Sequence, residues 1–377
     1  MMKKIKPMFM LMLTASLLGC TTPPAAPFYA PFDQVMKWFD HGTFGESRFY
    51  NYCPSTFIED GERYVYYCTN KVEGNITDYI GYHHGVYSKD QGWDWGEMSL
   101  VLGPTAGTWD QRHTCDPSVV KGEFTYQGEE YHYLMAFLGS IQSDNNGNET
   151  GLAVSKTPNG PFIKCDDINP IVPYDRENAI WGTGQASLVN IDQKGNILMF
   201  YSVGNKDGTY EEVREYDFSN LDEPVLINHA KVPTNGLLSG DNLICDADIC
   251  YDVANKKLLM VKGKIPYSPD RNAPAFIASS LVVYYLDLSA SAKPTDEVFK
   301  GTNAKNWRLV AEIGYEETGF MRNHNAGLVT DEYGHLLQDT DFIEIALTRS
   351  DLGNNEWAWL STYRIYSISR KLPYLEE

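Results

Sequence analysis

One short motif recurs five times along this chain, and it constrains the fold more than any other feature of the sequence. Each copy has a polar residue, then small residues, an apolar strand, a turn and a second apolar strand. The polar residues that open the copies are Cys53, Asp116, Gln185, Asp246 and Asn325. The copies lie about 60 to 80 residues apart, which is room for one four-stranded sheet with its loops.

The rest of the chain shows the pattern of an all-β protein. Short aromatic and β-branched runs alternate with Gly, Asp, Asn and Pro, and almost no helical period is present. Five twisted sheets that pack radially bury both faces and protect their edges. We therefore predict a five-bladed β-propeller with four-stranded antiparallel blades over residues 45–377. A β-sandwich followed by a second β domain is the alternative, and it leaves the five matched motifs unexplained.

The first strand of each unit is expected beside the central axis, where converging strands leave space only for small residues. The polar residues at the strand starts then face a shared central depression. We predict Asp116 as a base or stabilising group, Asp246 as its partner carboxylate and His324 as an assisting or acid group. Two carboxyl groups that share a pocket can divide acid and base roles between them, and an imidazole normally titrates near neutral pH. The structural alternatives are turn residues for Asp116 and Asp246, and a packing group or cation ligand for His324.

Neighbouring polar and aromatic residues are candidates for ligand binding. An Arg can hold a sugar hydroxyl or carboxylate, or form a salt bridge, and a Trp can stack on a sugar or pack in a core. For Asp248 the alternative is a structural role in the corner formed by Asp246-Ala247-Asp248. The predicted binding residues are Arg112, His113, Trp181, Gln185, Asp248, Arg322 and Asn325.

Two segments resemble a known superfamily. Asp116-Pro117-Ser118 with its Tyr-rich second strand resembles the inner strands of five-bladed glycoside hydrolases of families 43 and 32, and residues 155–162 resemble another segment of those enzymes. The resemblance implies hydrolysis or binding of polysaccharide side chains, and for hydrolysis it implies an inverting mechanism, which needs two carboxyl groups about 6.5–9.5 Å apart. Family 43 enzymes place a base Asp, a tuning Asp and an acid Glu in the first three blades. Those positions hold Cys53, Asp116 and Gln185 here, so only Asp116 carries over and the triad is degenerate.

Three functions are compatible with these residues. The first is a glycoside hydrolase that acts on an oligosaccharide or polysaccharide at an acidic pocket, and the second is a non-catalytic carbohydrate-binding propeller. The third is a structural or protein-binding propeller. The formal net charge of −19 disfavours nucleic acid as a partner. We expect a monomer without a cofactor or catalytic metal, although a central structural cation such as Ca²⁺ fits such a depression.

The N-terminal residues predict export. Lys3, Lys4 and Lys6 precede a short apolar segment, and residues 17–20 resemble a lipobox with Cys20 as the lipidated residue. An ordinary signal peptide is the alternative. We predict a signal peptide over residues 1–19 and a Pro-rich tether and lead-in over residues 20–44. The protein would then face the periplasm or the cell surface, with the lipid anchor as its membrane contact.

The other six cysteines suggest disulfides in an oxidising compartment. A two-residue turn at Asp60-Gly61 would place Cys53 opposite Cys68, so these two either form a disulfide or remain two free thiols. Cys245 and Cys250 lie on one predicted strand and face opposite sides, so we expect them not to pair with each other.

Overall fold

The computed structural model describes residues 49–88, 90–142, 146–265, 277–288, 298–299, 306–338, 340–350 and 363–372. Strands dominate these residues, and helix α2 (Tyr315–Thr318) is a single turn. Within these ranges, no helix is both long and apolar enough to cross a membrane. The predicted signal peptide, Cys20 and the tether all lie outside the described residues.

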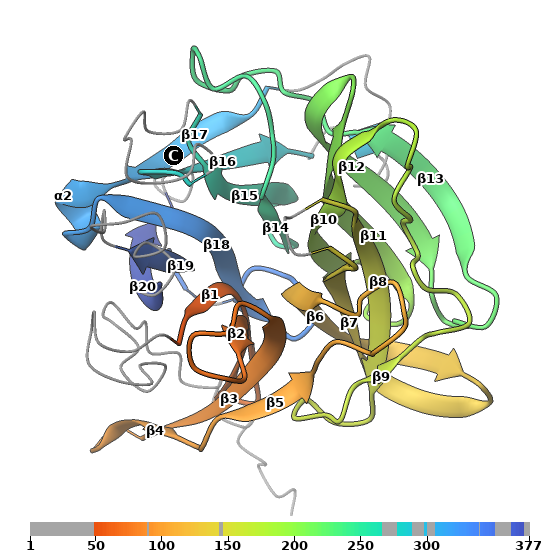
Figure 1. The fold of residues 1–377 in the computed structure, drawn as a ribbon. Coiled ribbons are helices and arrows are strands. Elements are labelled where there is room, and N and C mark those ends of the chain that lie inside the picture. Colours follow the sequence, from red (N-terminus) through yellow and green to blue (C-terminus); the bar gives the residue numbers. More distant parts are fainter. Residues whose placement is uncertain are drawn as a thin grey trace, which may run out of the picture.

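Antiparallel pairing divides the strands into consecutive groups (Figure 1). The first contains β1 (Asn51–Glu59), β2 (Glu62–Asn70), β3 (Asp78–Ser88), β4 (Gly92–Trp95) and β5 (Ser99–Leu102). The second contains β6 (His113–Tyr126), β7 (Glu129–Ser140), β8 (Asn148–Ser155) and β9 (Ile163–Lys164). The third contains β10 (Ala179–Asn190), β11 (Asn196–Asn205), β12 (Gly208–Asp217) and β13 (Val225–Lys231). The fourth contains β14 (Asp248–Asp252), β15 (Lys257–Gly263), β16 (Leu281–Asp287) and β17 (Arg308–Ile313), and the last contains β18 (Arg322–Asp331), β19 (Phe342–Ser350) and β20 (Arg364–Lys371).

The first strands of these groups surround a common centre. β1, β6, β10, β14 and β18 each contact the next in a closed ring, while β4, β13 and β17 lie at the periphery (Figure 1). β1 and β18 pair in parallel, with Thr56 opposite Val329, so strands far apart in the sequence close the ring. The predicted all-β propeller is confirmed. The last group has three strands within the described residues, so the count of five four-stranded blades stays a prediction.

The inner strands approach closely enough to require small residues. A Cβ atom at Gly327 would lie 2.2 Å from the carbonyl oxygen of Pro54, so any larger residue would push β18 away from β1. The hydroxyl of Ser118 accepts a 2.9 Å hydrogen bond from the backbone N–H of Leu188, which joins β6 to β10. Crowding at the axis thus explains the small residues that follow each polar residue of the repeat.

Apolar clusters lie between consecutive groups rather than at one centre. Leu134 of β7 packs in one cluster with Met199 of β11, and Phe57 of β1 packs in another with Met135 of β7. Three further clusters join the third group to the fourth, the fourth to the last, and the last to the first. Each sheet therefore buries both faces against its neighbours, as radial packing requires.

A buried ion pair also joins the last group to the first. The guanidinium of Arg63 on β2 donates to both carboxylate oxygens of Glu344 on β19, at 2.7 and 2.8 Å. Both side chains are fully buried. The paired geometry compensates the cost of removing two charges from water.

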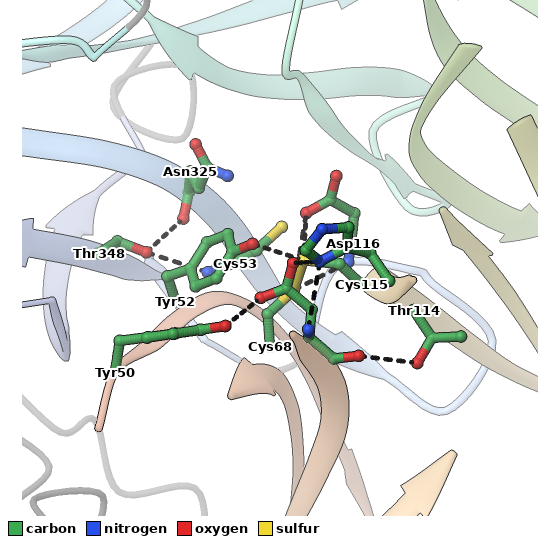
Figure 2. Close-up of a disulfide and its surroundings, with 11 residues drawn as sticks. Tyr50, Tyr52, Cys53, Cys68, Thr114, Cys115, Asp116, Asn325 and Thr348 are labelled. Carbon is green, nitrogen blue, oxygen red and sulfur yellow. Dashed lines mark hydrogen bonds and ion pairs between the residues drawn. A yellow bond between two sulfur atoms is a disulfide. The ribbon is translucent and has the colours of Figure 1, made fainter. Parts of the chain in front are cut away.

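The register of β1 and β2 corrects one prediction. Glu59 lies opposite Glu62, as the Asp60-Gly61 turn predicts, but Tyr52 and not Cys53 lies opposite Cys68. A bulge between Tyr52 and Ser55 shifts the ladder, so the even alternation that pairs Cys53 with Cys68 is wrong. Cys68 instead forms a disulfide with Cys115 at the start of β6 (Figure 2). Within the described residues, the free thiols are those of Cys53, Cys165, Cys245 and Cys250, so Cys245 and Cys250 are not paired with each other, as expected.

Candidate active site

The polar residues that open the five repeats share one unusual backbone conformation. Their φ angles are 52° for Cys53, 46° for Asp116, 54° for Gln185, 54° for Asp246 and 39° for Asn325. Positive φ is uncommon in residues other than Gly, and it costs free energy. The strand ladders are interrupted by bulges beside four of the five, and a bulge re-aims a side chain. We call these five residues the ring residues.

A side chain from the preceding group holds three of these strained turns. In each case it accepts a hydrogen bond from the backbone N–H of the ring residue, and it comes from the second strand of its group. Figure 2 shows the turns at Cys53 and Asp116. The pairs are Cys53 with Thr348 Oγ1 at 3.0 Å, Asp116 with Cys68 Sγ at 2.9 Å and Asp246 with Ser202 Oγ at 2.8 Å. The ring residues therefore depend on contacts between neighbouring groups for their position.

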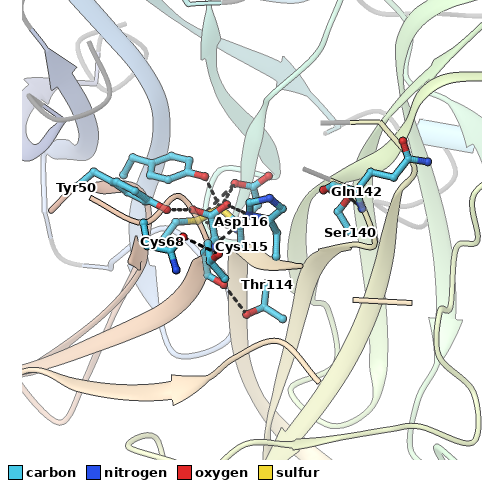
Figure 3. A network of polar contacts seen from close by, with 12 residues as sticks. Tyr50, Cys68, Thr114, Cys115, Asp116, Ser140 and Gln142 are labelled. Carbon is cyan, nitrogen blue, oxygen red and sulfur yellow. Dashed lines mark hydrogen bonds and ion pairs between the residues drawn. A yellow bond between two sulfur atoms is a disulfide. The ribbon is translucent and has the colours of Figure 1, made fainter. Parts of the chain in front are cut away.

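Asp116 lies in a polar network of the first two groups (Figure 3). Its side chain is buried, and burial raises the pKa of its carboxyl group to about 6. The Cys53 thiol donates a hydrogen bond that lowers this pKa, and the charge of Asp78 raises it. A carboxyl group with this pKa is mostly ionised at neutral pH but retains affinity for a proton.

Asp246 experiences a stronger shift. Burial raises the pKa of its carboxyl group well above the usual range, and the charge of Asp116 raises it further. A hydrogen bond from the backbone of Asn325 acts in the opposite direction. Its Oδ2 atom is buried and has no hydrogen-bond partner within the described residues. Of the two carboxyl groups, that of Asp246 therefore retains its proton to a higher pH than that of Asp116.

His324 lies beside Asp246, with 3.7 Å between its Nδ1 atom and Oδ2 of Asp246. Burial, together with the charge of Arg322, lowers the pKa of His324 to about 3. Nδ1 accepts a 3.3 Å hydrogen bond from the backbone N–H of Ala278, so a neutral ring carries its proton on Nε2. The expectation that this imidazole titrates near neutral pH is therefore wrong, because the ring is desolvated beside an arginine.

Of the remaining ring residues, Cys53 interacts with both carboxyl groups. The Cys53 thiol is desolvated and feels the charges of both Asp116 and Asp246, which raise its pKa, while Asn325 donates a hydrogen bond to it. Gln185 lies next to Cys245, with 3.9 Å between Oε1 and Sγ. The structure thus brings Asp116, Asp246 and the neighbouring His324 together, as predicted from their places in the repeat.

The sequence of this protein matches a known enzyme family. The sequence model described as glycosyl hydrolases family 43 matches residues 34–222, which is half of the chain. The chain belongs to family 43 of the glycosyl hydrolases. No curated protein sequence matches it.

Solved structures share the fold of this family 43 protein at low sequence identity. A catalytic domain of a family 62 α-L-arabinofuranosidase from Coprinopsis cinerea has a TM-score of 0.56 and 11% identity, over 90% of this chain and 97% of that one. A family 117 glycoside hydrolase from Zobellia galactanivorans has a TM-score of 0.54 and 12% identity, over 91% and 88% of the two chains. A fructofuranosidase from Schwanniomyces occidentalis, complexed with fructose, has a TM-score of 0.52 and 12% identity, over 92% and 59%.

Asp248 of the family 43 protein has a different environment from Asp246. Its Oδ1 accepts a 2.6 Å hydrogen bond from the hydroxyl of Ser187, and its Oδ2 accepts one of 2.6 Å from the backbone N–H of Leu328. Both oxygens therefore link inner strands. These contacts support the structural alternative for Asp248 rather than sugar binding.

The other predicted binding residues are dispersed. Arg112 is exposed, whereas His113 is buried with Nδ1 2.7 Å from Oδ2 of Asp78. Trp181 packs on Gly204, where a Cβ atom would lie 1.8 Å from the indole nitrogen. The buried Arg322 acts on His324 through its charge. Two of these residues are linked to the candidate active site: His113 contacts Asp78, whose charge raises the pKa of Asp116, and Arg322 lowers the pKa of His324.

Glu211, a buried residue of β12, is not among the site residues predicted from the sequence. Its Oε2 atom accepts a 2.8 Å hydrogen bond from the same Ser202 hydroxyl that anchors Asp246. Burial raises the pKa of its carboxyl group well above the usual range, and the charge of Asp246 adds to this. Glu211 and Glu212 are adjacent and alternate in direction, so one of them had to face inward, but the sequence does not show what it would meet.

One group of side chains has the spacing of a metal site. The ligand atoms of Cys53, Cys68 and Asp116 lie within 4.8 Å of one another. Cys68 is bonded to Cys115 and therefore cannot supply a thiolate. We assign no metal to these residues.

Proposed function

We propose that this protein hydrolyses a glycosidic bond in an oligosaccharide or polysaccharide with inversion, using Asp116 as the base and Asp246 as the acid. The observation that supports the proposal is the pair itself. Two buried carboxyl groups occupy equivalent ring positions, interact electrostatically, and have pKa values that are raised unequally. Carboxyl groups with different proton affinities are the usual means of dividing acid and base roles.

The unequal pKa values assign the roles. Asp116, with a pKa of about 6, is ionised at neutral pH and can take a proton from an attacking water. Burial raises the pKa of Asp246 well above its usual range, and the negative charge of Asp116 raises it further, so Asp246 retains a proton for the leaving oxygen. Inverting glycosidases use this division, with a water molecule between base and sugar.

His324 would act through Asp246 rather than as a proton donor. Its neutral ring lies next to Oδ2 of Asp246, and the backbone of Ala278 fixes its orientation. An uncharged neighbour does not stabilise the ionised form of Asp246, so the acid keeps its proton. We therefore assign His324 a positioning role.

A neutral carbohydrate suits the chemistry of this site. The buried Oδ2 of Asp246 and Oδ1 of Asn325 have no hydrogen-bond partners within the described residues, and both can accept hydrogen bonds from sugar hydroxyls. The clustered carboxyl groups and the formal charge of −19 disfavour anionic polymers, nucleic acid included. The proposal needs no cofactor, and a central structural cation such as Ca²⁺ stays a prediction.

We also propose that the protein acts after export. Cys20 would carry the lipid anchor, and the tether would hold a monomeric propeller at the periplasmic or outer cell surface.

Binding without hydrolysis is the second candidate function, because Cys53 and Gln185 occupy ring positions at which the family resemblance expects carboxylates.

Turnover on defined substrates separates the two candidates. The purified protein is screened with 4-nitrophenyl glycosides, including α-L-arabinofuranoside and β-D-xylopyranoside, and with neutral polysaccharides, and the anomer released is identified by proton NMR. Hydrolysis predicts that Asp116→Asn and Asp246→Asn each lower kcat by about 10²- to 10⁴-fold, while ligand binding by calorimetry persists. The exposed Asp94→Asn serves as a matched control and should leave kcat unchanged. Calorimetric binding without any turnover by the wild type would favour the binding function.

A further inference from the structure

We propose that the Cys68–Cys115 disulfide is a positioning group for Asp116, because it anchors the turn that carries this residue and presents to its carboxyl group sulfur atoms that cannot donate a hydrogen bond. The proposal rests on the proposed role of Asp116 as the base. It assigns to the disulfide a part in setting the proton affinity of that base, in addition to the link between two groups of strands.

The disulfide contacts Asp116 at both its backbone and its side chain (Figure 2). Cys68 Sγ accepts a 2.9 Å hydrogen bond from the backbone N–H of Asp116. Oδ1 of Asp116 lies 3.1 Å from Cys115 Sγ and 3.7 Å from Cys68 Sγ. Both cysteines are fully or almost fully buried, so water does not replace these contacts.

The groups that anchor the other ring residues differ from the disulfide in their hydrogen-bonding capacity. The equivalent backbone N–H groups of Cys53 and Asp246 are bonded to the hydroxyls of Thr348 and Ser202. A hydroxyl accepts one hydrogen bond and still donates its own proton, as Ser202 does to Glu211. The sulfur of a disulfide has no proton to donate. At Asp116 alone among these three positions, the anchoring group therefore lacks a donor.

The consequence concerns the charge of the carboxyl group. A hydrogen-bond donor beside a carboxylate stabilises its ionised form and lowers its pKa. The Cys53 thiol is such a donor to Asp116. The two disulfide sulfur atoms close to Oδ1 add no second one. The hydroxyl of Tyr52 lies 3.0 Å from Cys115 Sγ, where the oxidised sulfur can only accept. Asp116 thereby keeps the proton affinity that a base requires near neutral pH.

The test must remove the disulfide without creating another one. Cys53 Sγ lies within 4.8 Å of Cys68 Sγ, so a single substitution of Cys115 would leave two thiols close enough to react. Two double variants avoid this. Cys68→Ser/Cys115→Ser retains an acceptor for the Asp116 N–H group and adds donors, as at the other two positions. Cys68→Ala/Cys115→Ala provides neither acceptor nor donor, and both variants lack the covalent link.

The titration of Asp116 is followed by carbon-13 NMR of labelled Asp carboxyl groups, with the signal assigned by Asp116→Asn. We expect the pKa of Asp116 in the Ser variant to fall by about one unit below the wild-type value, and in the Ala variant to stay at or above it. With an active substrate, the acidic limb of the kcat profile should move with this pKa in the Ser variant. The Ala variant should lose kcat without that shift, because its turn has no anchor.

A purely structural disulfide would give another result. Both variants would then lose thermal stability equally, and the pKa of Asp116 would match the wild type in each; this outcome overturns the proposal. Because the NMR titration needs no turnover, it remains decisive even if no glycoside is hydrolysed. An NMR shift without turnover would count against the proposed function but not against the contact between disulfide and carboxyl group.

Discussion

The hydroxyl of Ser187 donates a 2.6 Å hydrogen bond to Oδ1 of Asp248, only two residues after the ring residue Asp246. The other oxygen of Asp248 accepts from the backbone of Leu328, so this carboxyl group links three inner strands. Oδ2 of Asp246 has no such partner within the described residues. Asp246 and Asp248 are only two residues apart but have different surroundings. We therefore assign a structural role to Asp248 and a chemical role to Asp246.

The first prediction follows from this difference. Asp248→Asn should lower the free energy of unfolding by about 1–3 kcal/mol, because an amide nitrogen would face the N–H group of Leu328 or the hydroxyl of Ser187. Urea denaturation measures this loss. The folded variant should keep the wild-type kcat, whereas Asp246→Asn should lose activity. A stable Asp248→Asn protein with no activity would instead assign Asp248 to the chemistry.

The second prediction concerns stability and pH at Asp116. Its pKa rises from 3.8 to about 6 on folding, so the folded state binds the proton more tightly. This favourable contribution is complete below about pH 4 and is lost as the pH rises through 6. Asp116→Asn removes the penalty, and should therefore stabilise the protein at pH 7.5 by at most about 3 kcal/mol and have little effect at pH 4. Thermal unfolding at the two pH values checks this, and equal effects at both would contradict it.

The third prediction is a bell-shaped pH profile of kcat/KM. Activity should fall as the pH drops through about 6, where Asp116 gains a proton, and fall again at higher pH, where Asp246 loses one. Because the pKa of His324 is lowered to about 3, His324→Gln should not remove either limb. Loss of the alkaline limb in that variant would show that His324, and not Asp246, supplies the proton.

The fourth prediction concerns closure of the propeller. Arg63→Met should destabilise the protein by about 3–5 kcal/mol, because Glu344 would remain buried without its charged partner. The double variant Arg63→Met/Glu344→Leu should recover much of that loss, since no uncompensated charge is left. Chemical denaturation of the two single variants and the double variant measures the coupling, and purely additive losses would argue against it.

Local patterns sufficed to predict the framework of the molecule. The five polar residues followed by small residues are recognisable from the repeated residue pattern, and all five adopt positive φ in the structure. The small residues were interpretable because inner strands of any propeller crowd at the axis, as Gly327 and Pro54 do. The hairpin turn at Asp60-Gly61 was likewise predictable, because a two-residue turn depends on its own residues.

The partners of these residues were decided by the tertiary structure. A bulge moved Cys53 out of register and left Cys68 to bond Cys115, 47 residues away, which even alternation cannot foresee. Burial beside Arg322 removed the titration of His324 from the neutral range, and Glu211 reached the site from the third strand of its group. The sequence by itself therefore determined which residues open each inner strand, because backbone pattern is local. Only the folded structure decided their bonding and ionisation, because these depend on side chains brought together from distant strands and on the exclusion of water between them.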